Sequence, residues 1–213
     1  MSVFKAVSAL FFPPRETAPV VVLSPSGNLK NEADAVRGLF ERGLSEYHLR
    51  RPRWNADKVA AWLRALPAEF RSRVVLHQCP ELVKKFGLLG YHVSADAAFP
   101  ADLPREKISV QCREYADLEK LGGACRCVML GPVFPRADRD LTVPARTPAE
   151  FGAIAAYARG HGFSAPIFAF GGVAADNVRL CRKLGFDGVA AVGAVWESGS
   201  DPVSAYRALR RKW

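Results

Sequence analysis

Pro166-Ile167-Phe168-Ala169-Phe170-Gly171-Gly172-Val173-Ala174-Ala175-Asp176-Asn177 reads as an apolar strand that runs into a glycine pair, and Gly185-Phe186-Asp187-Gly188-Val189-Ala190-Ala191-Val192-Gly193-Ala194 repeats the pattern after one intervening helix. Glycine at a strand-to-helix junction lets the backbone approach a ligand closely, and helix-terminal N–H groups can bind an anion. Two such junctions in succession favour a phosphate site formed by Gly171, Gly172, Val192 and Gly193. The alternative is that these glycines only form tight turns.

Working outward from this stretch, six earlier apolar runs are each followed by a helical pattern or its remnant. The expected strands are 19–24, 46–50, 74–77, 90–93, 107–111 and 127–131, followed by the two quoted above. Eight strands that alternate with helices predict a parallel sheet closed into a (β/α)8 TIM barrel, with an open doubly wound sheet as the structural alternative. We expect one barrel domain over residues 19–213, preceded by an N-terminal extension over residues 1–18.

The composition is that of a globular protein: 213 residues, 49% hydrophobic and 24% charged. The net charge of +9 comes from Lys and Arg residues scattered along the chain, so no nucleic-acid partner is expected. The five cysteines are an odd number, and Cys125-Arg126-Cys127 lacks the spacing of a zinc site. A cytoplasmic location is expected, and no apolar stretch approaches the roughly 20 residues of a membrane span. Assembly into a homo-oligomer is left open.

In a barrel of this kind the active site lies where the strands end, so polar residues at the strand ends are the candidates. Because successive side chains of a strand point to opposite faces, Glu46, His48 and Arg50 are expected on the same face. Arg50 is expected to meet a phosphate, whereas Arg51 and Arg53 are expected to reach solvent. The full set of expected mouth residues is His48, Arg50, His77, His92, Ser109, Gln111 and Arg139. For His92 the alternative is a hydrogen-bonded side chain in the barrel interior, and for Arg139 it is a solvated loop charge.

From Val20 onward the chain resembles the thiamine phosphate synthase and thiazole tautomerase family. The resemblance rests on Tyr47-His48-Leu49-Arg50, Gly90-Tyr91-His92-Val93, Met129-Leu130-Gly131-Pro132-Val133-Phe134-Pro135, Ala169-Phe170-Gly171-Gly172-Val173 with Asn177, and Gly185-Phe186-Asp187-Gly188-Val189-Ala190. It implies phosphorylated thiazole and pyrimidine partners. The thiazole phosphate would meet the backbone at Gly171, Gly172, Val192 and Gly193. The pyrimidine diphosphate would meet Arg50, Ser109 and Arg139. In the family's synthases the diphosphate leaves with the help of Mg2+, and the thiazole nitrogen captures the resulting pyrimidine methyl cation.

The chain departs from the family pattern where the metal would bind. His77-Gln78 stands in place of the usual Asn-Asp, and Ala97 stands in place of a second aspartate, with Asp96 one position away. Mg2+ is therefore left open as a cofactor, because its usual carboxylate ligands are absent. Gln111 replaces a usual histidine, and Pro132 occupies the position of the tautomerase histidine. His77 is then the candidate acid or base from the opposite side of the mouth.

Three functions follow from these residues. The first is thiamine phosphate synthesis with an altered diphosphate site, in which His77, Arg50 and Arg139 take over part of the metal's role. The second is a thiazole tautomerase-like isomerase that uses His77 or His48 to move a proton. The third is a non-catalytic protein that binds thiamine phosphate or thiazole phosphate.

Overall fold

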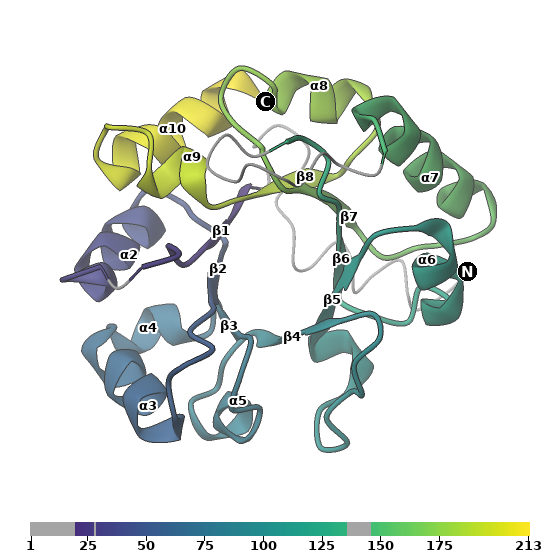
Figure 1. The fold of residues 1–213 in the computed structure, drawn as a ribbon. Helices are drawn as coiled ribbons and strands as arrows, with labels where there is room; N and C mark the ends of the chain where they lie inside the picture. The colour runs from purple at the N-terminus through teal and green to yellow at the C-terminus, as the bar shows by residue number, and fades with distance from the viewer. Residues whose placement is uncertain (1–19, 28, 136–145) are drawn as a thin grey trace.

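The computed structural model describes residues 20–27, 29–135 and 146–213. Within them eight parallel strands close into a barrel in chain order, surrounded by helices (Figure 1). The strands are β1 (Val20–Leu23), β2 (Glu46–Leu49), β3 (Val74–Leu76), β4 (Gly90–Ser94), β5 (Ile108–Cys112), β6 (Cys127–Leu130), β7 (Ile167–Phe170) and β8 (Gly188–Ala191). Pairing of β1 with β8, with Val21 opposite Ala190, closes the ring. The predicted TIM barrel is confirmed, and the open doubly wound sheet is wrong.

The helices lie outside the strands and follow them in turn (Figure 1). They are α2 (Glu32–Glu41), α3 (Ala56–Ala65), α4 (Ala68–Arg71), α5 (Glu81–Lys85), the 3-10 turn η1 (Arg105–Lys107), α6 (Tyr115–Leu121), α7 (Pro148–Gly160), α8 (Val178–Lys183), α9 (Gly193–Trp196) and α10 (Pro202–Lys212). Thr147 begins α7 with a capping box to Glu150. Residues 94–105, after β4, form no α-helix, and only η1 precedes β5.

Two apolar clusters stabilise the barrel. The larger one fills the space between the strands and the surrounding helices. The smaller one consists of side chains of the other parity, which point into the barrel: Val21, Leu23, Cys127, Met129, Phe168 and Ala190. This inner apolar cluster comes from β1, β6, β7 and β8. The polar inward residues come from β2, β4 and β5, whereas the inward residue of β3 is Val75.

The loop after β6 packs directly on the glycine pair after β7. Val133 N–H donates to Phe170 O at 2.8 Å, and Phe134 N–H donates to Gly171 O at 3.1 Å. A Cβ atom on Gly172 would lie 2.6 Å from the carbonyl oxygens of both Phe134 and Pro135. The glycine pair therefore has a packing role, whatever ligand it also binds.

Gly172→Ala should destabilise the fold more than Gly87→Ala. Gly172 has φ +61° and Gly87 has φ +62°, but no atom lies within 4 Å of a Cβ on Gly87. Both variants lose about 1 kcal/mol to the left-handed backbone, and only Gly172→Ala adds about 1–3 kcal/mol of overpacking. Urea unfolding of the two variants measures the difference, and equal losses would show that the loop contact is not tight.

Two predictions fall outside the described residues. The N-terminal extension over residues 1–18 and the mouth residue Arg139 both lie there. No helix in the described parts of the chain is long and apolar enough to span a bilayer.

Candidate functional site

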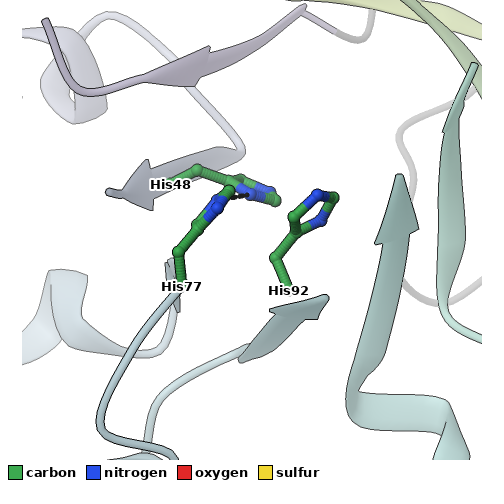
Figure 2. A group of neighbouring side chains, drawn as sticks. All are labelled: His48, His77 and His92. Atoms are coloured by element: carbon green, nitrogen blue, oxygen red, sulfur yellow. Dashed lines mark hydrogen bonds between the residues drawn. The ribbon is translucent and has the colours of Figure 1, made fainter. Parts of the chain in front are cut away.

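The three histidines expected at the mouth lie close together. His48 lies on β2, His77 follows β3, and His92 lies on β4; their rings point toward one another (Figure 2). His48 Nδ1 lies 2.9 Å from His77 Nε2, and the ring centroids of His77 and His92 are 4.4 Å apart. His48 is fully buried and His92 is 7% exposed, while His77 is half-buried. The histidine cluster, defined as His48, His77 and His92, therefore has one accessible member.

A buried ion pair supports this cluster from inside the barrel. Glu46, at the start of β2, accepts a hydrogen bond from Arg126 Nη1 at 2.7 Å and a second one from Arg126 Nη2. The same carboxylate is bonded to Nε2 of His48, two residues along the strand. Glu46 is 2% exposed and Arg126 is 8% exposed. Arg126 therefore fixes Glu46, and Glu46 fixes the ring of His48.

The hydrogen-bond partners assign the ring tautomers. The Glu46 carboxylate accepts only, so neutral His48 carries its hydrogen on Nε2, and its Nδ1 accepts from Nε2–H of His77. Ser109 Oγ donates to Tyr91 O at 3.4 Å and accepts from Nδ1 of His92 at 2.9 Å. His92 Nε2 is then left with a free lone pair.

Burial sets the charge state of the cluster. Burial lowers the pKa of His77 and of His92 well below the ordinary 6.5, and the neighbouring histidines and Arg50 lower both pKa values further. Burial also lowers the pKa of His48, although Glu46 opposes that shift. Burial favours the neutral form of Glu46, but Arg126 and His48 outweigh it and hold the pKa of Glu46 far below 4.5. At neutral pH the cluster thus consists of three uncharged imidazoles above an ionised carboxylate.

The two arginines after β2 differ in burial. Arg50 is exposed, with its backbone N–H donating to Ser24 Oγ at 2.9 Å, and its charge acts on both His77 and His92. The prediction that Arg51 reaches solvent is wrong. Arg51 is 4% exposed, forms an ion pair with Glu32, and donates to Pro25 O at 2.6 Å. Arg51 is buried because its guanidinium pairs with the buried carboxylate of Glu32, the first residue of α2.

The remaining expected mouth residues do not make a magnesium site. Ser109 is buried against His92, and Gln111 Nε2 donates to the carbonyls of Cys112 and Gly131 at 3.2 and 3.3 Å. Asp96 is exposed and accepts a hydrogen bond from Ser94. Mg2+ prefers carboxylate and phosphate oxygens. The described donor set, three imidazole nitrogens with a hydroxyl and an amide, does not fit that ion.

The glycine pair after β7 keeps unused donors. Among the described residues, the N–H groups of Gly171 and Gly172 donate to no acceptor, although Gly171 O and Gly172 O accept from Phe134 N–H and Asn177 Nδ2. After β8, the turn at Val192 and Gly193 begins the short helix α9. Backbone N–H groups without an acceptor among the described residues, as at Gly171 and Gly172, are what a phosphate needs.

Basic residues that are separated in the sequence gather on the outside of the barrel. Arg179, Arg182 and Lys183 of α8 share a surface hollow with Arg211, Lys212 and Trp213 at the C-terminal end of the chain. Basic residues that are scattered along the sequence are therefore clustered at this point of the folded protein. This hollow involves none of the residues expected at the mouth.

These features define a single-domain (β/α)8 barrel protein whose polar inward side chains lie on β2, β4 and β5 and directly after β3. The chain belongs to the thiamine monophosphate synthase family, whose model matches residues 20–195. The thiamine-phosphate synthase of Desulfitobacterium hafniense (strain DSM 10664 / DCB-2) is 27% identical over 195 residues, which cover 84% of this chain and 88% of the relative.

Solved structures agree on the fold. A thiamine phosphate pyrophosphorylase from Bacteroides thetaiotaomicron matches with a TM-score of 0.73 at 21% identity, covering 91% of this chain and 96% of the other. The corresponding protein from Pyrococcus furiosus matches with a TM-score of 0.70 at 20% identity, covering 94% and 97%. The family resemblance expected from the sequence is confirmed.

Proposed function

We propose that this protein joins hydroxymethylpyrimidine diphosphate to thiazole phosphate and releases diphosphate, as a thiamine phosphate synthase does. The observation that carries the proposal is the family match over residues 20–195, in a chain whose barrel is complete. The C–O bond between the pyrimidine methylene and the diphosphate breaks, and the thiazole nitrogen forms a bond to that carbon. Diphosphate takes the electron pair of the broken bond.

The described residues suggest how the two substrates are held. The N–H groups of Gly171 and Gly172, which have no acceptor in the described parts of the chain, bind the thiazole phosphate together with the turn at Val192 and Gly193. Arg50, exposed beside the histidine cluster, binds the diphosphate and stabilises its charge as it leaves. Ser109 and Gln111 are held by their neighbours, so they shape the pyrimidine side of the mouth. Neutral His77 offers a hydrogen bond there, but no positive charge.

Arg50→Ala should lower kcat/KM for the diphosphate substrate by roughly ten- to a hundred-fold, the value of one charge-assisted contact. Arg53→Ala removes an exposed arginine three residues away and should change nothing. Arg50→Lys should recover part of the loss, because it keeps the charge without the two-pronged contact. The measurement is steady-state formation of thiamine phosphate. Equal kcat/KM values for Arg50→Ala and Arg53→Ala would show that Arg50 does not bind the diphosphate.

The function itself is tested by incubating the purified protein with both substrates and following thiamine phosphate by its fluorescence after oxidation. Product formation supports the synthase. No product, together with a higher melting temperature in thiamine phosphate, would contradict it and indicate a binding protein. Proton exchange into a thiazole carboxylate phosphate that is lost in His77→Ala would instead indicate the tautomerase.

A further inference from the structure

The histidine cluster has the composition and spacing of a transition-metal site. His48, His77 and His92 each offer one ring nitrogen, and the three nitrogens lie within 4.8 Å of one another. Neutral imidazole is the form that ligates metals, and three histidines with one open position form a common catalytic zinc site. We propose that His48 Nδ1, His77 Nε2 and His92 Nε2 bind a divalent ion of the zinc class, which takes the place of the family's magnesium at this end of the barrel.

The groups around the cluster already orient its rings as metal ligands require. Glu46 holds Nε2–H of His48 and Ser109 holds Nδ1 of His92, so in both rings the nitrogen aimed away from the cluster is occupied. Carboxylate and hydroxyl partners of this kind fix the tautomer and the ring direction of metal-binding histidines. Glu46 is itself fixed by Arg126.

For His48 and His77, little movement separates the observed pair from a loaded site. Two nitrogens bound at 2.0–2.1 Å to a tetrahedral ion lie about 3.3 Å apart. His48 Nδ1 and His77 Nε2 are 2.9 Å apart because they share a hydrogen bond. Binding moves the hydrogen of His77 from Nε2 to Nδ1, which has no partner among the described residues, and the two rings separate by a few tenths of an ångström. Since His77 is half-buried, the fourth position of the ion opens toward the mouth.

The test is calorimetric titration of chelator-treated, reduced protein with Zn2+, repeated with Co2+ so that the optical spectrum reports tetrahedral nitrogen ligation. The chain has four histidines, so His161→Ala is a matched control outside the cluster. Cys79→Ser removes the half-buried thiol two residues after His77. We expect one ion per chain in wild type, His161→Ala and Cys79→Ser, loss of that ion in His77→Ala, and no displacement by millimolar Mg2+.

Ser109→Ala supplies a second measurement that leaves all three ligands in place. It should weaken Zn2+ binding by about 10- to 100-fold, the usual effect of removing a group that orients a ligand. Stoichiometric binding that persists in His77→Ala, binding that is lost in Cys79→Ser, or no tight binding to wild type would each overturn the proposal. All of these readouts use the protein without substrates, so they stand apart from success or failure of the synthase assay.

Discussion

Lowering the pH from 6.5 to 5 should reduce the free energy of unfolding by about 3 kcal/mol through His77 and His92 alone. Their folded-state pKa values lie well below 6.5, mainly because both rings are buried. Below pH 6.5 the unfolded chain binds a proton on each ring while the folded chain does not, so unfolding takes up protons and stability falls with pH. Each ring contributes about 0.7 kcal/mol per pH unit at pH 6.5, rising to about 1.4 kcal/mol per pH unit as the unfolded ring becomes fully protonated.

Urea unfolding of metal-free protein at pH 7.5, 6.5, 5.5 and 5 measures this loss. His77→Asn should make the decline shallower by about 2 kcal/mol between pH 6.5 and 5, because one proton is no longer taken up. An unchanged decline in this variant would mean that His77 is protonated in the folded protein. The same decline limits the pH range in which activity can be measured.

Glu46→Gln should destabilise the protein by about 3–5 kcal/mol, the cost of leaving one member of a buried ion pair without its partner. Glutamine is nearly isosteric with Glu46, but it leaves the buried guanidinium of Arg126 uncompensated and weakens the bond to His48. Glu41→Gln is the matched control, because Glu41 pairs with Arg37 at 3.7 Å on an exposed helix surface. That change should cost less than about 1 kcal/mol.

Equilibrium unfolding at pH 7.5 compares the two variants. Glu46→Gln combined with Arg126→Met should recover part of the loss, since the double change removes both buried charges. The stability that Glu46 contributes is complete above pH 4.5 and declines as the pH falls below it, because the folded-state pKa is depressed. A Glu46→Gln variant as stable as Glu41→Gln would show that the pair is not buried in solution.

The fold could be predicted because its signals are local. Strand runs that alternate with helical patterns and glycine stops predicted eight units in the right order, and β2 begins at Glu46 as expected. The short helices α4 and α9 were missed, since four residues are too few for a periodic pattern.

The site could be predicted only in part. Its histidines were found because each lies on a predicted strand: His48 and His92 are within β2 and β4, and His77 directly follows β3. Arg126 was missed because it precedes β6. In addition, the inward-facing residues of β6 are Cys127 and Met129, so the alternation along the strand does not point Arg126 into the barrel. Its long side chain reaches Glu46, 80 residues away in the sequence. Arg51 was misplaced for the same reason: a distant carboxylate, Glu32, decides its burial. Neither partner can be read from spacing along the chain.

Three neutral histidines, oriented by Glu46 and Ser109, form the centre of the proposed site. Long-range 1H–15N spectra of the imidazole nitrogens in metal-free protein at pH 7.5 test this arrangement directly, with His77→Asn and His161→Ala used for assignment. The account predicts neutral rings for His48, His77 and His92, with the hydrogen on Nε2 in His48 and on Nδ1 in His92. Imidazolium signals from these three residues at that pH would contradict it.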